Sequence, residues 1–388
     1  SDGGGFLPEG VLPETQDSEY RRQASFVKFL GTTREVTHPM TLVRSAHGDV
    51  IARENQNGIQ WLMKKLEHGL FWGNSKLAAP GKEGVQFDGL NTLIDAENTY
   101  DCAGKELKDT DINYGSQMIL ENYGTPTDFF LPYEVLSEFS QTYFPKERVI
   151  MPTAGQGYQA GLVVNKFQTH GGAVEFNPDL FLQKTKPLSP NATGGIKAPT
   201  APASVVVAVN GTEVGAEFGK SGAGTYEYSV TACNRFGESV PTAAGSSVAI
   251  TSSELGKGIE VKITNATAMV SEPEYFRIYR TEKDGKTKYC IAEVPAANVS
   301  AGGVTTFLDK NETMPNTYTA FMGEFTPEVL AFKQLAPIMK MDLALLGPAY
   351  RWMILIYGVP QLYAPKKWMK FKNIKASNFN DAPGKLYN

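Results

Sequence analysis

The sequence has few of the residues that most often carry chemistry. Its three cysteines, Cys102, Cys233 and Cys290, are spread along 388 residues without a CxxC pair. This spacing excludes a disulfide framework and argues against a structural zinc site, so we expect three reduced, partly buried thiols. No HExxH pattern and no GxSxG turn occurs. The sequence therefore offers no catalytic residue, no cofactor-binding residue and no metal ligand, and it predicts a protein that is not an enzyme.

Long apolar runs and excess positive charge are also absent. The longest apolar segment, "WMILIYGV" at residues 352–359, has the length of a strand and is far short of the ~20 residues that span a bilayer. The formal net charge is −4, so the molecule as a whole is not a nucleic-acid-binding cation. With 41% apolar and 20% charged residues, the chain is typical of a globular protein with two or three domains and no membrane partner.

Two segments resemble binding motifs but depart from them. The segment "GQGYQAG" (155–161) lacks the GxGxxG spacing and is interpreted as a loop. The segment "DTDINYGSQMILE" (109–121) has the alternating acids of a calcium loop, but its glycine is seventh and its glutamate thirteenth. An acidic helix start explains it better. The histidines are scattered, at His38, His47, His68 and His170.

The first half of the chain shows helical and strand patterns in alternation. Residues 24–48 are β-branched and rich in turn signals, which predicts a two-stranded excursion. A helix of about 22 residues follows, capped by Asp49 and ended at Gly73, because Ile59, Leu62, Met63, Leu66 and Leu70 fall on one face. Between residues 105 and 190, two helices alternate with short strands such as "TDFFL" and "GAVEF", which predicts a compact α+β domain.

The composition changes at the Pro-, Gly- and Ala-rich linker of residues 186–204. From residue 204 to 309 there is no helical period, but seven short alternating strands are separated by turn signals, which is typical of a sandwich. Tyr228, Val230 and Ala232 are expected to point into its core.

The C-terminal part is expected to begin with a helix and continue as strands. Thr326 as N-cap and Pro327 in the first turn predict a helix that ends before Pro337. The strands "AYRWMILIYG" and "KKWMKFKNIK" follow. The second strand carries five lysines without an acid, which indicates either a sheet edge protected by lysines or a cationic face near a polyanion. These lysines are Lys366, Lys367, Lys370, Lys372 and Lys375.

The order of these elements resembles the major capsid proteins of tailed double-stranded DNA bacteriophages. The segment "NGIQWLMKKLEHGLFWGN" followed by "EGVQFDGLNTLID" is similar to the family's spine helix and the glycine-punctuated segment after it. "ILENYGTPTDFFLPYEVLSEF" resembles the helix, strand and helix that enter its axial domain. "MDLALLGPAYRWMILIYGVPQLYAPKKWMKFKNI" resembles its closing strands. The resemblance covers residues 1–190 and 315–376 and depends on the order of diffuse motifs.

The resemblance implies an α+β fold of the tailed-phage capsid type, divided into seven segments. In chain order these are an N-terminal arm (1–23), an extended β loop (24–48), a peripheral domain with the spine helix (49–104), a first axial part (105–197), an insertion (198–312), a second axial part (313–350), and peripheral closing strands with a tail (351–388). Exposed apolar side chains in the first two segments, including Phe26 and Phe29, would need the surface of a neighbouring subunit.

The implied function is structural. Hexamers and pentamers would assemble in the host bacterial cytoplasm into the icosahedral shell of a virion. The shell would enclose double-stranded DNA through weak, non-specific contact, with a portal and decoration proteins as further partners. Symmetry would multiply each weak contact between subunits.

The central segment "TYEYSVTACNRFGES" resembles a run of fibronectin type III and immunoglobulin-like domains, and "FRIYRTEKDGKTKYCIAEV" resembles a hairpin of the same modules. The resemblance implies an inserted all-β sandwich displayed on the outer surface of the shell. The Tyr-Arg strand follows the Tyr-x-Val-x-Ala strand instead of preceding it, so a permuted topology is one interpretation. An alternative function is a phage tail or fibre protein, or a cell-surface adhesin, whose sandwich binds a glycan or a protein.

Overall fold

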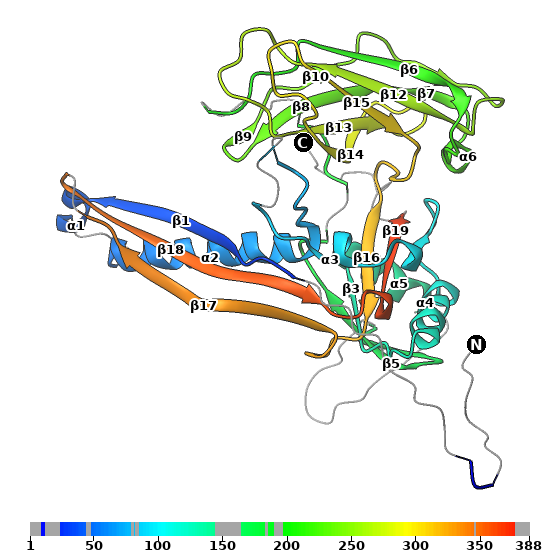
Figure 1. Cartoon of the computed structure of the whole chain (residues 1–388), viewed down its shortest axis with the longest axis horizontal. Coiled ribbons are helices and arrows are strands. Elements are labelled where there is room, and N and C mark those ends of the chain that lie inside the picture. The colour runs from blue at the N-terminus through cyan, green and yellow to red at the C-terminus, as the bar shows by residue number, and fades with distance from the viewer. Residues whose placement is uncertain are drawn as a thin grey trace, which may run out of the picture.

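The computed structural model describes residues 9–11, 24–43, 48–78, 81, 85–143, 164–182, 185–189, 197–344 and 347–376, and the structural statements below concern these residues. Figure 1 shows three parts. A long extension (β1, α1, α2, β17 and β18) reaches to one side. A body, which consists of a six-stranded sheet with helices α4 and α5, lies at its base, and an insertion domain (residues 204–309) lies above both.

Several sequence expectations fall outside the described residues. These are most of the N-terminal arm (1–8 and 12–23), His47, the loop 155–161 and the tail 377–388.

The extension is a three-stranded antiparallel sheet in the order β1-β18-β17, with α2 packed along one face. Side chains alternate across a strand, so β18 directs every second residue, Trp352, Ile354 and Ile356, toward Leu62 and Leu66 of the helix. The bounds are β1 (Lys28–Thr37), α1 (His38–Leu42), α2 (Val50–Trp72), β17 (Leu330–Asp342) and β18 (Ala349–Leu362).

Helix α2 is the long helix that the sequence predicts, and its ends are confirmed. The Asp49 side chain accepts a hydrogen bond from the backbone N–H of Ile51 at 2.9 Å, and the backbone N–H of Gly73 donates to the carbonyl of Gly69. Both contacts satisfy backbone groups that a helix end leaves unpaired. Both ends of the helix are therefore set by residues close to it in the sequence.

The described residues of the predicted two-stranded excursion, 24–43 and 48, contain one strand, β1. Strand β1 pairs over its whole length with β18, from Lys28 opposite Gly358 to Thr37 opposite Ala349, and the chain then turns into α1. The partner strand comes from the other end of the sequence. Alternation along a segment shows that it is extended, but not which strand it joins.

The predicted helix after Thr326 is wrong, because residues 330–342 form the edge strand β17. Its register against β18 shifts between Gln334 and Ala336 and again between Ala336 and Met339, the interval that contains Pro337. Proline cannot donate to a sheet and is tolerated at such irregularities on edge strands. Pairing with the long strand β18 outweighed the local helix signals.

The body contains a mixed sheet in the order β2-β19-β16-β3-β5-β4. Its strands are β2 (Thr99–Asp101), β3 (Asp128–Leu131), β4 (Lys166–Thr169), β5 (Gly172–Pro178), β16 (Tyr318–Gly323) and β19 (Trp368–Ile374). The helices are α4 (Asp109–Glu121) and α5 (Tyr133–Tyr143), with short turns α3 (Leu90–Leu93), η1 (Ala96–Asn98) and η2 (Pro365–Lys367). The acidic segment 109–121 is therefore a helix, as its spacing indicated.

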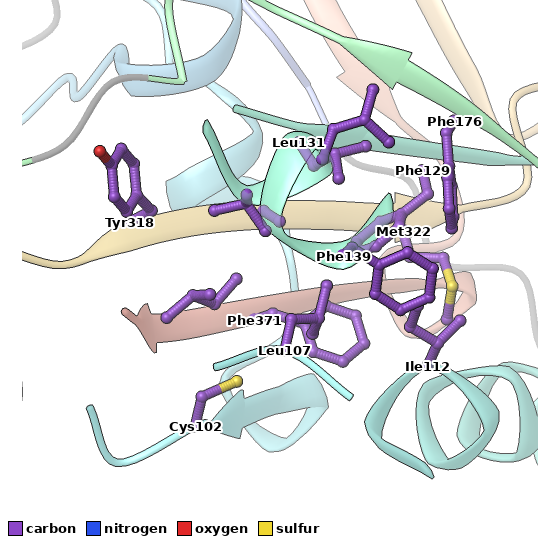
Figure 2. Close-up of a cluster of buried hydrophobic side chains, with 14 of the residues drawn as sticks. Cys102, Leu107, Ile112, Phe129, Leu131, Phe139, Phe176, Tyr318, Met322 and Phe371 are labelled. Atoms are coloured by element: carbon purple, nitrogen blue, oxygen red, sulfur yellow. The ribbon is translucent and has the colours of Figure 1, made fainter. Parts of the chain in front are cut away.

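Figure 2 shows the core of the body, to which β3, β5, β16, β19 and α5 contribute aromatic side chains. Phe129 of β3 is fully buried, with its ring centroid 5.6 Å from that of Phe176 and 5.4 Å from that of Phe371. The predicted inward residues of α5, among them Val135 and Phe139, are buried in the same cluster. This core joins strands from distant parts of the sequence.

Two of the expected domain segments, 313–350 and 351–388, each contain strands of two different sheets. Within 313–350, β16 belongs to the body, whereas β17 belongs to the extension. Within 351–388, β18 belongs to the extension, whereas β19 lies between β2 and β16 in the body. The chain therefore crosses between the two parts once in each segment.

The insertion domain is all-β apart from one helical turn, α6 (Phe218–Ser221). One sheet has the order β10-β8-β13-β14 with β9 beside β8, and a second has the order β15-β12-β6, while β11 pairs with β7. Tyr228, Val230 and Ala232 are at most 1% exposed in the shared core, as predicted.

The strands of the insertion domain are β6 (Ser204–Glu213), β7 (Gly224–Tyr226), β8 (Tyr228–Asn234), β9 (Gly237–Glu238), β10 (Thr242–Ala243), β11 (Val248–Ile250), β12 (Lys257–Thr264), β13 (Tyr275–Thr281), β14 (Lys288–Pro295) and β15 (Val304–Asp309). The seven segments read as strands from the sequence are all extended here. The Tyr-Arg strand β13 pairs directly with β8.

Candidate assembly surface and domain junction

The residue types that carry catalysis are not brought together. Across the described part of the chain, no three His, Cys, Asp or Glu side chains gather in a way that could hold a metal ion. Cys102 and Cys233 are buried and Cys290 is partly buried. Burial raises the pKa of each of these thiols to about 12, so all three are protonated at neutral pH. They serve as small packing side chains.

The described helices include none that is long and apolar enough to cross a membrane.

The lysine-rich strand β19 is not a sheet edge, so the edge-protection interpretation is wrong. It pairs with β16 on one side and with β2 on the other. Of the five lysines in and beside this strand, four form ion pairs with acids. The N–O distances are 3.6 Å for Lys366–Glu97, 3.0 Å for Lys367–Glu324, 3.6 Å for Lys372–Asp101 and 3.9 Å for Lys375–Glu282. These acids neutralise most of the charge that a polyanion would meet.

Lys370 is the lysine of this group without an ion pair among the described residues. Burial, together with the charge of Lys372, lowers the pKa of Lys370 to about 8, against an opposing effect of Glu312. The side chain is half-buried in the sheet. The structure therefore gives little support to the interpretation of this strand as a cationic binding face.

The most prominent unpartnered surface lies on the extension, on the sheet face opposite α2. Phe29 is 72% exposed there, and its ring meets that of Tyr357 edge-on at 4.9 Å. Met341, 46% exposed, is opposite Met353 on the same sheet. Phe26, just before β1, is 77% exposed. Large apolar side chains exposed close together mark interaction surfaces.

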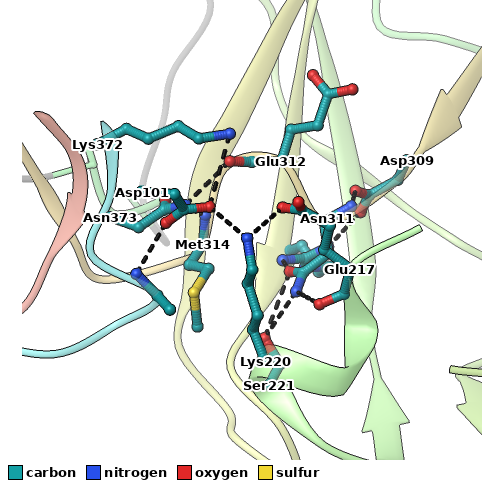
Figure 3. A network of polar contacts seen from close by, with 12 residues as sticks. Asp101, Glu217, Lys220, Ser221, Asp309, Asn311, Glu312, Met314, Lys372 and Asn373 are labelled. Carbon is teal, nitrogen blue, oxygen red and sulfur yellow. Dashed lines mark hydrogen bonds and ion pairs between the residues drawn. The ribbon is translucent and has the colours of Figure 1, made fainter. Parts of the chain in front are cut away.

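A second feature is the junction between the body and the insertion domain, shown in Figure 3. Asp101 at the end of β2 lies at its centre. One of its oxygens is 2.7 Å from the Lys220 amine of α6 and 3.6 Å from the Lys372 amine. The other accepts hydrogen bonds from the Asn373 side-chain amide at 2.9 Å and from the backbone N–H of Ala103 at 2.8 Å.

Asn373 extends the same network to the chain that leaves the insertion domain. Its amide donates to the carbonyl of Glu312 at 3.0 Å and its oxygen accepts from the N–H of Met314 at 2.8 Å. It adopts a φ of 57°, a conformation that asparagine tolerates better than most residues. The segment that enters the domain is also held, since Cys290 N–H donates to Lys186 O at 2.9 Å.

The charge state of Asp101 follows from these contacts. Burial by itself raises the pKa of Asp101, but the hydrogen bonds from Lys220, Ala103 and Asn373 and the charge of Lys372 outweigh it and lower the pKa. The side chain is only 14% exposed. No sequence motif indicated this site, because Lys220 and Asn373 lie 119 and 272 positions from Asp101 in the sequence.

We expect Asp101→Asn to lower the stability of the junction by about 1–3 kcal/mol at pH 7, the usual effect of losing hydrogen bonds to a charged group. Because the pKa of Asp101 is lowered in the folded protein, its stabilisation is complete above the ordinary pKa of about 4 and is lost as the pH falls through the lowered value. The difference in melting temperature between the two proteins should therefore be largest at pH 7 and should shrink as the pH falls below about 4 toward the lowered pKa.

The control for this experiment is Asp342→Asn, which removes a 79% exposed partner of Lys340 and should change little. A melting difference between wild type and Asp101→Asn that is the same at pH 3 and pH 7 would contradict the assigned charge state.

The family model and the sequence relatives that match this chain are all described as major capsid proteins. A family model described as SU10 major capsid protein matches residues 12–201. The major capsid proteins of Staphylococcus phage S25-3 and Staphylococcus phage K are each 28% identical over 379 residues, which cover 95% of this chain and 79% of the relative. A putative major capsid protein of Enterococcus phage phiEF24C is 29% identical over 370 residues, 94% of this chain and 78% of the relative.

Solved structures are more distant. The holo-SrpI encapsulin complex of Synechococcus elongatus PCC 7942 aligns with a TM-score of 0.39 and 7% identity, over 90% of this chain and 75% of the other. Mycobacterium phage Ogopogo aligns with a TM-score of 0.35 and 10% identity, over 94% and 83%. At these scores the likeness carries no argument about the fold.

The sequence relatives and the family model define a class first: structural proteins of virus particles, not enzymes. Within that class, the relatives are phage major capsid proteins, and this chain is similar to them along nearly its whole length. The prediction that the protein is not an enzyme is confirmed by these comparisons.

Proposed function

We propose that this subunit assembles as hexamers and pentamers into an icosahedral shell of the tailed-phage type around double-stranded DNA. In this proposal, assembly takes place in the host bacterial cytoplasm, and a portal and decoration proteins complete the particle. The extension corresponds to the peripheral domain, and the body corresponds to the axial domain. The insertion domain is immunoglobulin-like and lies on the outer surface.

The observation that carries the proposal is the apolar face of the extension. A sheet that projects from the body and exposes Phe29 and Met341 gains stability only when another surface covers it. Burying one aromatic side chain removes roughly 150–250 Å² from water, which is worth several kcal/mol at about 25 cal/mol per Å². Closed symmetry repeats such a contact at every subunit.

Few free positive charges on the lysine-rich strand β19 are available for contact with DNA. The lysine-rich strand is mostly neutralised by acids, and the net charge of the chain is −4. Any contact with packaged DNA is therefore weak and independent of sequence.

The alternative of a tail, fibre or adhesin protein is disfavoured, because the capsid relatives align over 95% of the chain and not over the sandwich alone.

The proposal predicts that the purified chain forms shells or capsomers and that Phe29→Asp reduces their yield at least tenfold. The charge would be placed in a contact that symmetry repeats in every subunit, while Phe29 is too exposed to matter for the fold of one subunit. Negative-stain microscopy and sedimentation velocity measure the assembly, and circular dichroism confirms that the variant is folded.

Val270→Asp is the matched control, since Val270 is 78% exposed but lies on the insertion domain. A wild-type chain that stays monomeric at high concentration would overturn the proposed assembly. Normal shells from Phe29→Asp would instead show that another surface makes the contact.

A further inference from the structure

A cleft of about 280 Å³ lies where the extension meets the body. Its walls come from α2, from the residues around α3, from β3 and from the start of β17. The lining is strongly apolar and includes Leu93, Phe130, Ala331 and Phe332. This volume is close to the lower limit of sites for small organic molecules, which are typically apolar with a few polar groups that fix the orientation.

The cleft has two charged lining residues, and both are acids. Glu67 of α2 and Asp179, which follows β5, both line the cleft, and they lie close enough for the charge of Asp179 to act on the Glu67 carboxyl group. Burial, and then the charge and hydrogen bond of Asp179, raise the pKa of Glu67. No lysine or arginine among the described residues forms an ion pair with either acid.

Asp179 is itself held in place by the backbone. Its carboxylate accepts a hydrogen bond from the N–H of Phe181 at 2.6 Å, and the carbonyl of Phe181 accepts one from the Trp72 indole at 2.9 Å. The segment after β5 is therefore tied to the end of α2. The two carboxyl groups therefore lie at the rim of an apolar cleft, and a backbone hydrogen bond holds that of Asp179 in place.

We propose that this cleft binds a small organic cation with an apolar body, such as an arylalkyl ammonium ion, whose ammonium group lies between Glu67 and Asp179. The apolar body would fill the space between Leu93, Phe130 and Phe332. The ammonium group donates charge-assisted hydrogen bonds to both carboxylates. This proposal does not depend on shell assembly, since the cleft is formed within one chain.

Binding would also connect the extension to the body. The ligand would contact α2 and β17 of the extension and β3 of the body at the same time. A ligand that binds only the folded form stabilises it by RT ln(1 + [L]/Kd). A rise in melting temperature with ligand concentration is therefore the expected signature.

The test uses the full chain and two probes of the same shape. Phenethylammonium chloride carries the cation, and 2-phenylethanol is its neutral analogue. We expect isothermal titration to show the ammonium ion binding at least tenfold more tightly than the alcohol, with a matching difference in thermal shift. Equal affinities, or no binding of the ammonium ion, would overturn the proposal, and this comparison needs no variant.

Variants then locate the site. Glu67→Gln, nearly isosteric, should weaken phenethylammonium binding at least tenfold, and Ala331→Leu should reduce the affinity for both probes by filling the cleft. Glu54→Gln, on the same helix but outside the cleft, is the matched control and should leave both affinities unchanged. Unchanged binding in Glu67→Gln would place the cation elsewhere and overturn the assignment.

Discussion

Arg280→Met is expected to lower the free energy of unfolding of the insertion domain by about 3–5 kcal/mol, the usual cost of breaking a buried ion pair from one side. Arg280 is fully buried, forms an ion pair with Asp309 and bonds the side-chain oxygen of Asn311. Asp309, 3% exposed, also accepts from the Tyr228 hydroxyl at 2.7 Å. Without the guanidinium, that carboxylate remains buried and uncompensated.

Arg280→Met would also remove two contacts of the guanidinium with aromatic rings, which lowers the stability further. The guanidinium carbon lies 5.2 Å from the ring centre of Phe218 and 5.6 Å from that of Tyr226, so the charge is also stabilised by aromatic faces. The double variant Arg280→Met/Asp309→Leu should recover part of the stability, because it removes both charges together. Denaturant unfolding followed by circular dichroism measures all three proteins.

Lys262→Ala is the control for this series, since Lys262 is 54% exposed in the same domain and contacts only Glu260 at 3.8 Å. We expect it to change stability by less than about 0.5 kcal/mol. A loss below about 1 kcal/mol for Arg280→Met would contradict the buried ion pair and its surroundings.

Phe129→Ala is expected to destabilise the body by about 3–5 kcal/mol, the range for removing a large buried aromatic side chain. The ring is 0% exposed and packs edge-to-face against Phe176 and Phe371. The neighbours belong to β5 and β19, so the cavity would weaken contacts across the sheet as well as with α5. Thermal unfolding and the soluble yield of the protein measure the effect.

Tyr133→Ala provides the comparison, because that aromatic side chain, at the start of α5, is 54% exposed. Its loss should cost less than about 0.5 kcal/mol. If both variants melt at the wild-type temperature, Phe129 is not part of a tightly packed core.

The failures of sequence reasoning have a common origin. The segment after Thr326 carries a helix cap and a proline in the first turn, but it pairs with β18, a strand that follows it in the chain. Strand β19 carries five lysines in and around it and looks like an edge, but β2, from far earlier in the sequence, covers it. The next strand along the chain decided the first outcome and a strand from far earlier in the sequence decided the second, and the local pattern could report neither.

Neither the junction at Asp101 nor the apolar cleft could be predicted from the sequence. The junction at Asp101 joins residues from β2, α6 and β19. The cleft joins Glu67 to Asp179 across more than a hundred positions. Neither set has a spacing that marks it, because ion pairs and cavities depend on how separate elements pack, not on the order of residues within one element.

Features controlled by short-range physics could be derived from the sequence alone. The caps of α2, the acidic start of α4, the strands of the insertion domain and the inward direction of Tyr228, Val230 and Ala232 all follow from hydrogen bonding and side-chain alternation over a few residues. Only the tertiary structure decided which strands pair, which apolar face stays uncovered and which charges are neutralised. Those outcomes depend on contacts between segments hundreds of residues apart, and the free energy of such contacts is not encoded in any one of them.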